Sequence, residues 1–125
     1  MTPEERELRR RWRFYRTAVG REPVADFIRG LGRDDRAAIL AELRAVQIGG
    51  LAAARHLRGD VYEARAEGDR QSFRVLFAPQ GRGRILLALE AFSKKTQRTP
   101  PEAIRLAEQR LADWRTRARV NEPPR

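Results

Sequence analysis

The pattern of apolar and polar positions divides the chain into extended and helical segments. Aromatic and β-branched residues dominate positions 12–19, which predicts a first strand from Trp12 to Val19 that ends at Gly20. Pro23 then begins a short helix, because proline fits the first turn of a helix and the apolar residues after it share one face. The apolar residues of that face are Phe27, Ile28 and Leu31.

A second helix follows directly and ends at the Gly49-Gly50 pair. Its apolar residues at helical spacing are Ile39, Leu43 and Val46. Asp34 or Asp35 is expected to cap its start. We expect the two helices to form a hairpin that packs its apolar face on a sheet. A capping pattern at positions 2–5 predicts a further short helix before the first strand.

Three strand segments come next, at positions 61–66, 72–78 and 85–92, separated by polar or glycine-containing turns of hairpin length. They predict an antiparallel meander. Alternation in the second segment places Phe73 and Arg74 on opposite faces. The third segment is almost wholly apolar, which predicts a strand buried on both faces in the middle of the sheet.

A last helix is predicted after Pro100-Pro101, and positions 115–125 form an arginine-rich tail that we expect to be disordered. The apolar stripe of the helix consists of Ile104, Ala107, Leu111 and Trp114. The predicted fold is therefore a single α+β domain with its core at about residues 12–114 and flexible ends. An antiparallel sheet, made of the N-terminal strand and the meander, carries the helical hairpin and the C-terminal helix.

The charge of the chain narrows the classes of partner that it is expected to bind. It carries 27 basic and 17 acidic residues, a net charge of +10 and a pI near 11.4, which favours RNA, DNA or an acidic protein as partner. There is no cysteine, and the single histidine, His56, disfavours a histidine metal site, so no metal or cofactor is expected. No segment is apolar enough for a membrane span or a signal peptide, which predicts a cytoplasmic protein.

Two arginines lie inside the predicted strands. Alternation puts Arg65 on the same face as Glu63, and Arg74 interrupts the apolar second strand of the meander. Strand charges either point across a solvated sheet face or line a charged cleft, and composition alone favours the solvated face. A cationic sheet face can hold RNA, because arginine offers paired donors to phosphate oxygens.

The only two lysines, Lys94 and Lys95, stand together at the end of the most apolar run. Metal-free cleavage of RNA needs a base for the 2′-hydroxyl, cations at the phosphate and an acid for the leaving oxygen. A lysine can be the base only if its pKa is lowered, which adjacent lysines held near Arg65 and Arg74 would achieve. The alternative is that both lysines only solubilise the end of the strand. His56 is a secondary candidate, since a lone histidine before a strand is usually a surface or core residue.

Four short motifs occur in a characteristic order. They are L-x-G-x-x-Y-E-x-R at 57–65, F-R-V-L-F at 73–77, A-F-x-K-K-T at 91–96 and P-x-E-A at 100–103. In this order they resemble the HigB-type, phage-derived branch of the RelE/ParE toxin superfamily over about residues 12–114. The resemblance implies a small α+β toxin that cuts messenger RNA at the ribosomal A site without a metal. It also implies a cognate antitoxin, which we expect to be a helix-turn-helix protein.

The resemblance also implies roles for single residues. Arg65 and Arg74 match basic residues that grip and polarise the scissile phosphate, and Lys95 matches a basic position near the leaving group. Residues expected to bind substrate are Lys94, Arg58, Gln97 and His56.

The chain departs from some relatives at two places, and two other functions stay open. Thr99 and the prolines after it offer neither the tyrosine nor the histidine that some relatives carry near the last helix, and Glu63 stands where some carry lysine. The base and acid are therefore unassigned. The superfamily includes ParE-type inhibitors of DNA gyrase that act by protein binding, and a non-catalytic RNA-binding module would also fit the charge.

Overall fold

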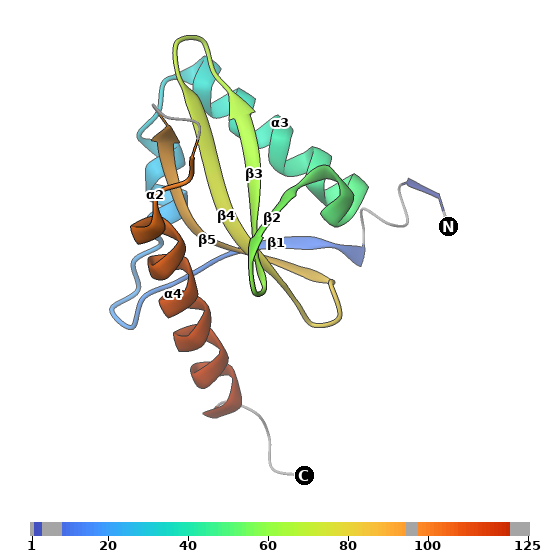
Figure 1. Cartoon of the computed structure of the whole chain (residues 1–125), viewed down its shortest axis with the longest axis vertical. Helices are drawn as coiled ribbons and strands as arrows, with labels where there is room; N and C mark the ends of the chain where they lie inside the picture. Colours follow the sequence, from blue (N-terminus) through green and yellow to red (C-terminus); the bar gives the residue numbers. More distant parts are fainter. Residues whose placement is uncertain (1, 4–8, 95–97, 121–125) are drawn as a thin grey trace.

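The computed structural model describes residues 2–3, 9–94 and 98–120, which form an α+β fold in three layers (Figure 1). The predicted short helix at positions 2–5 lies largely outside the described residues. In chain order the elements are β1 (Arg11–Phe14), α2 (Pro23–Arg29), α3 (Arg33–Gly49), the 3-10 helix η1 (Gly50–Ala53), β2 (Arg55–Arg58), β3 (Val61–Glu67), β4 (Ser72–Gln80), β5 (Ile85–Lys94) and α4 (Pro101–Val120).

The sheet has five strands in the order β1-β5-β4-β3-β2. β3, β4 and β5 form the predicted antiparallel meander, and β2 adds to it antiparallel to β3. β1 pairs with β5 in parallel, with Arg11 beside Ile85 and Phe14 beside Ala88, so the sheet is mixed rather than wholly antiparallel. The α+β class is confirmed.

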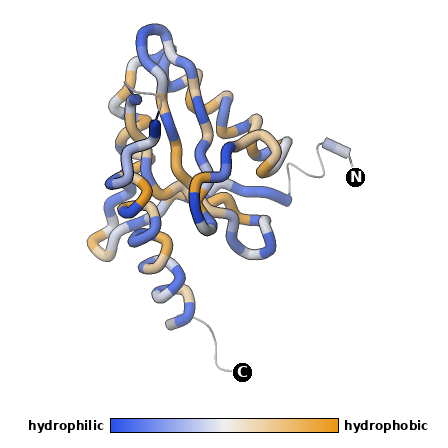
Figure 2. Tube along the Cα trace, viewed as in Figure 1, coloured by the Kyte–Doolittle hydropathy of each residue, from blue (hydrophilic) through white to orange (hydrophobic). Residues whose placement is uncertain are grey.

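The predicted length of the first strand is wrong. β1 ends at Phe14, and a turn follows in which the Gly20 amide donates to the Thr17 carbonyl at 2.9 Å. Gly20 has φ +88°, a conformation that glycine adopts without strain, so the β-branched residues before it belong to a turn. Figure 2 shows the two hairpin turns, at 68–71 and 81–84, as hydrophilic segments.

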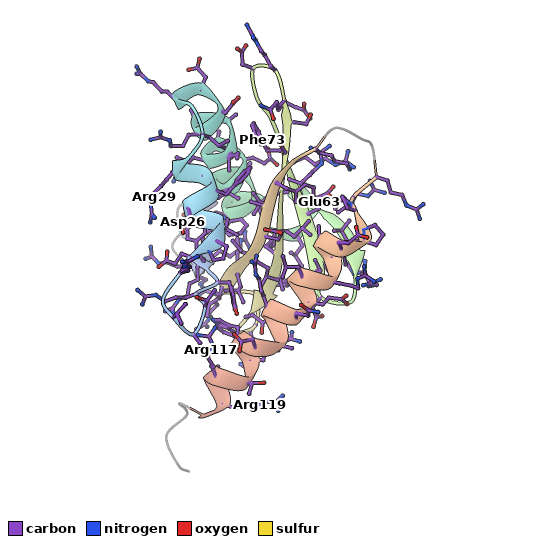
Figure 3. The ribbon with its side chains drawn as sticks, turned by 90° about the vertical axis from the view of Figure 1, so that its left-hand side faces the viewer. Asp26, Arg29, Glu63, Phe73, Arg117 and Arg119 are labelled. Carbon is purple, nitrogen blue, oxygen red and sulfur yellow. The ribbon has the colours of Figure 1, made fainter. Side chains whose placement is uncertain are left out.

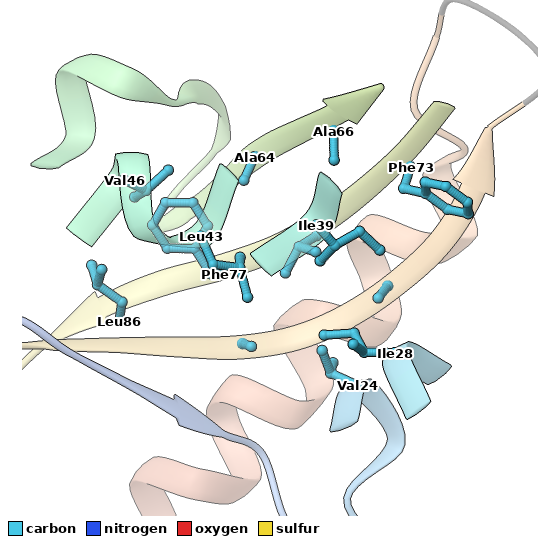
Figure 4. Packing of buried hydrophobic residues seen from close by; sticks show 13 residues of the cluster. Val24, Ile28, Ile39, Leu43, Val46, Ala64, Ala66, Phe73, Phe77 and Leu86 are labelled. Carbon is cyan, nitrogen blue, oxygen red and sulfur yellow. The ribbon is translucent and has the colours of Figure 1, made fainter. Parts of the chain in front are cut away.

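The helices α2 and α3 cover one face of the sheet, as predicted (Figure 4). This cluster, the hairpin core, joins Val24, Ile28, Ile39, Leu43 and Val46 of the helices to Phe73, Val75, Phe77, Leu86 and other sheet residues. The expected aspartate cap is wrong, because Gly32 is the N-cap residue of α3 and no side chain caps it. Asp34 and Asp35 lie in the first turn instead, and Asp35 accepts a hydrogen bond from the Asp69 amide in the β3–β4 turn at 3.0 Å.

α4 covers part of the opposite face. Its predicted stripe is confirmed and packs on Val61, Leu76, Leu87 and Leu89; we call this cluster the α4 core. The helix continues to Val120, so the predicted disorder of the tail is wrong for residues 115–120, whereas 121–125 lie outside the described residues. β5 contributes to both cores, as its apolar sequence predicted, but it lies second from the edge and β4 is the middle strand.

A bulge interrupts the pairing of β4 with β5. Leu76 pairs with Glu90 while Phe77 pairs with Ala88, so Leu89 is an extra residue on β5. The carbonyl of Leu89 accepts a hydrogen bond from Arg110 Nη1 on α4 at 2.7 Å. Because an extra residue reverses the alternation of side chains, residues after the bulge face the opposite way from those a regular strand would present.

Candidate active site

The charged end of the α4-side sheet face is the candidate site. Arg65 on β3 lies directly opposite Arg74 on β4, and Lys94 on β5 is paired with Ser72, two positions from Arg74 on the same face. The bulge at Leu89 places Lys94 on this face, because regular alternation from Leu87 would have sent it to the hairpin core. Three cations from three adjacent strands are thereby brought together.

Glu63 is buried on the sheet beside these cations and offsets part of their charge (Figure 3). It is only 1% exposed, and Arg65 Nε donates to its Oε1 at 3.1 Å. Arg74 Nε lies 3.6 Å from the same oxygen, and the hydroxyl of Thr99 donates to Oε2. A buried carboxylate needs such partners, and like charges paired across strands need a counter-ion, so each group stabilises the other.

Arg74 is buried, unlike the solvent-facing arginine that composition favoured. Its Nη1 donates to the Phe73 carbonyl at 2.9 Å, which fixes the guanidinium on the sheet. Its Nε is also buried and makes no hydrogen bond to any residue that the structure describes. The fixed charge of Arg74 therefore adds to the positive potential of the cluster from beneath its surface.

Lys94 is buried beside these groups, at 8% exposure. Burial lowers the pKa of its ammonium group; Glu63 acts in the opposite direction, and the nearby charges of Arg74, Arg65 and Arg55 lower it further. The sequence predicted a lowered pKa from neighbouring cations, and the direction is confirmed. The larger cause, burial, could not be foreseen from the sequence.

The structure separates the other predicted residues from this cluster or does not describe them. Lys95 and Gln97 lie outside the described residues. His56 on β2 is exposed, donates from Nε2 to the Gly59 carbonyl at 2.7 Å and lies against the ring of Tyr62, on the face opposite Glu63. Arg58, also on β2, pairs with Glu108 of α4.

Two pockets flank the cluster and share Arg55. One of about 340 Å³ is lined by Arg55, Leu57, Arg98, Thr99 and Ile104. The other, of about 300 Å³, is lined by Glu42, Ala52, Ala53, Ala54, Arg55, Glu63 and Arg65. Each pocket therefore carries two arginines beside the Glu63 cluster, and the second also contains the carboxylates of Glu42 and Glu63.

Sequence reasoning missed Arg55. It named Thr99 only as a departure from relatives, and it placed Glu63 beside Arg65 without giving it a role in the site. The alternation of the V-Y-E-A-R stretch was the available signal for Glu63, because it places Glu63 beside Arg65 on one face. Arg55 lies beside Glu63 because β2 pairs the two residues. β2 was not predicted, because its sequence is charged. Thr99 carries no sequence signal, since its contact depends on how the chain enters α4.

Other kinds of site and segment were sought in the part of the chain that the structure describes. There, no group of three or more histidine, aspartate or glutamate side chains could hold a metal ion. In the same ranges, no helix is long and apolar enough to cross a membrane.

Comparisons with known proteins bear on the whole chain. The family described as "Phage derived protein Gp49-like (DUF891)" matches residues 26–112. In each of two strains of Mycobacterium tuberculosis, a protein named "Probable endoribonuclease HigB1" is 34% identical over 128 aligned residues, covering 99% of this chain and 99% of the relative. The chain therefore belongs to the phage-derived, Gp49-like family and is a HigB-like member of it, as its motifs predicted.

Proposed function

We propose that this protein is the toxin of a type II toxin-antitoxin pair and acts as an endoribonuclease on messenger RNA. The single observation that carries the proposal is the cluster of Arg65, Arg74 and Lys94 around the buried carboxylate of Glu63. The name of the Mycobacterium relatives supports the reaction class, since they are called probable endoribonucleases.

The chemistry follows from the charges. The 2′-oxygen of one nucleotide attacks the adjacent phosphorus and the bond to the 5′-oxygen of the next nucleotide breaks, which leaves a cyclic phosphate and a 5′-hydroxyl. Arg65, whose side chain is 45% exposed, can contact the phosphate directly, and the buried charge of Arg74 beside it helps to stabilise the charge that grows on the phosphate oxygens. Glu63 positions both guanidiniums without touching the substrate.

Lys94 is the residue suited to proton transfer. A lysine with a lowered pKa can take the 2′-hydroxyl proton in its neutral form or supply a proton to the leaving oxygen in its charged form. Lys95, which the family resemblance places near the leaving group, would carry the complementary role, and Gln97, His56 and Arg58 would contact flanking nucleotides. Cleavage is proposed to occur on the ribosome and to need no metal.

The direct test is cleavage of a defined messenger RNA in a translation system of purified components. Arg74→Gln is expected to slow cleavage about 100-fold or more, the usual effect of losing one donor at a developing oxyanion. Arg29→Gln is the control, because Arg29 pairs with Asp26 on the exposed side of α2. Unchanged cleavage by Arg74→Gln would remove Arg74 from the site.

Two further measurements test metal-free cleavage and the alternative functions. Replacing a non-bridging oxygen of the scissile phosphate with sulfur should slow the reaction equally in magnesium and in a thiophilic metal; rescue by that metal would contradict metal-free cleavage. If the wild type leaves RNA intact, a supercoiling assay distinguishes inhibition of gyrase from simple RNA binding.

The family also predicts a partner. A cognate antitoxin, proposed to be a helix-turn-helix protein, would neutralise the toxin by covering its cationic groups. Since the proposed substrate is messenger RNA on the ribosome, the proposed place of action is the cytoplasm.

A further inference from the structure

A second cationic surface lies along the edge strand β1, away from the candidate active site. We call it the edge strip, and it consists of Arg9, Arg11, Arg13, Arg16, Arg84 and Arg117. All of these arginines are exposed except Arg117, which is partly buried. They come from the start of the chain, from the turn before β5 and from the end of α4, so only the folded protein assembles the strip.

Two adjoining pockets give the strip its shape. One of about 780 Å³ is lined by Arg9, Arg11, Trp12, Arg13, Gly81, Arg84 and Ile85. The other, of about 390 Å³, is lined by Arg13, Phe14, Arg16, Glu22, Trp114, Arg117 and Ala118. Because Arg13 lines both, the two hollows form one continuous surface.

The strip has little compensating negative charge. Glu22 is the one acidic residue that lines it, and its carboxylate lies 3.9 Å from Arg16. Arg117 pairs with Asp113 at 2.7 Å, but its Nε is buried without a hydrogen-bond partner among the described residues. Among the residues that the structure describes, no ion pair joins Arg9, Arg11, Arg13 or Arg84 to a carboxylate. Such an excess of guanidinium groups favours an anion with many charges.

The strip is remote from the cluster around Glu63. Figure 3 shows Glu63 beside the start of α4 and Arg117 near its other end. Thr99, which bonds Glu63, comes two residues before α4, and Arg117 lies in its last turn, so about 25 Å of helix separates the two sites. One nucleotide cannot contact both.

The chemistry of the strip indicates which anion it fits. Its aromatic rings serve as walls, because Trp12 donates its indole N–H to the Leu43 carbonyl at 2.7 Å and packs edge-on against Phe77. Rings committed to a core cannot stack on the bases of single-stranded RNA. The large apolar side chains found exposed in the described ranges are Val19 and Leu40, and neither lines the strip. The large apolar residues that do line it are partly buried, so its exposed large side chains are arginines.

We propose that the edge strip binds the phosphate backbone of double-helical RNA without regard to base sequence. Backbone binding to a helix needs only correctly spaced cations, which the strip supplies. The proposal rests on the proposed function. It adds a second RNA contact, in which the edge strip holds structured RNA while the Glu63 cluster acts on a separate strand.

The test measures binding of a short RNA hairpin by fluorescence anisotropy over a series of salt concentrations. The triple variant Arg11→Gln, Arg13→Gln, Arg84→Gln is expected to lower the slope of log K against log salt by about 2 to 3 and to weaken binding at least tenfold at ~0.1 M salt. The matched control replaces the exposed Arg29, Arg33 and Arg36 on the helical hairpin with glutamine, which removes the same charge elsewhere. It should change binding less than about twofold.

Two outcomes would overturn the proposal. An equal loss in both triple variants would show that net charge alone attracts the RNA. Unchanged RNA binding together with weaker binding of the antitoxin would make the strip a protein-docking surface. Arg74→Gln separates this proposal from the proposed function, since it should slow cleavage about 100-fold or more but change hairpin binding less than about twofold. A wild type that binds the hairpin through the strip but never cleaves RNA would overturn only the proposed activity.

Discussion

Glu63 holds the charged residues of the sheet together by pairing with both Arg65 and Arg74. Two arginines paired across adjacent strands would repel each other, and a buried carboxylate alone would be strongly destabilising. Together they form a compact group that also holds Thr99 at the entrance to α4. The same carboxylate therefore organises the proposed phosphate site and fastens the last helix to the sheet.

Glu63→Gln is expected to lower the free energy of unfolding by about 3 kcal/mol, because it leaves the buried guanidinium of Arg74 without a counter-ion. Urea unfolding measures this loss. Glu102→Gln is the control, since its pair with Arg105 is exposed and should contribute less than about 0.5 kcal/mol. Equal effects of the two substitutions would contradict the central place of Glu63.

Lys94 makes stability depend on pH. Its pKa is lowered in the folded protein, so between that pKa and the ordinary value of 10.5 the unfolded chain binds the extra proton. Stability therefore rises as pH rises through the lowered pKa, and the cost of burying the charge is fully present below it. Lys94→Met should remove this dependence and stabilise the protein more at about pH 7 than near pH 10. Urea midpoints over that pH range measure it, and a pH-independent difference between the two proteins would contradict it.

The bulge in β5 determines which face of the sheet Lys94 lies on. Without Leu89 as an extra residue, Lys94 would point into the hairpin core and Ser93 would face Arg74. An uninterrupted apolar sequence cannot reveal a bulge, because burial on both faces removes the alternation that would mark it. The sequence therefore predicted the position of the strand but not the direction of its last side chains.

Arg110 supports the bulge from α4, since its guanidinium satisfies the Leu89 carbonyl and lies 3.4 Å from the Glu90 carboxylate. Arg110→Ala is expected to cost about 1–3 kcal/mol, because a partly buried carbonyl then lacks its donor. Chemical denaturation is the measurement, with Arg105→Ala on the exposed side of α4 as the matched control. A loss no larger than that of the control would show that the bulge forms without α4.

Other elements show the same division between local and distant causes. The meander and the helices were predictable, because their periodicity and turns are local. The parallel pairing of β1 and the existence of β2 were not, since both depend on strands that approach from elsewhere in the chain. Arg65 and Arg74 were recognised as candidates from the sequence, whereas their ion pairs with Glu63 and the burial of Arg74 were not.

The whole molecule has two cores that share one sheet. β4 and β5 supply side chains to both, so neither core can form while the other is lost. The two tryptophans report on them separately, because Trp12 packs against the hairpin core and Trp114 against the α4 core.

Unfolding is therefore expected to be a single transition. In each of the variants Trp12→Phe and Trp114→Phe, the fluorescence of the remaining tryptophan and the far-ultraviolet circular dichroism should give the same urea midpoint. Fluorescence of Trp114 that is lost before the circular dichroism signal would show that α4 detaches while the sheet persists.

β1 is made before the other four strands of the sheet, yet it pairs with β5, which comes last of the five and begins only at Ile85. Most of the chain must be made before this pairing is possible, and closing so long a loop is unfavourable until the meander exists. The nascent protein thus remains one strand short, and its edge arginines unassembled, until β5 has been made. A cell that makes this chain has the interval between the synthesis of β1 and that of β5 in which to provide its neutralising partner.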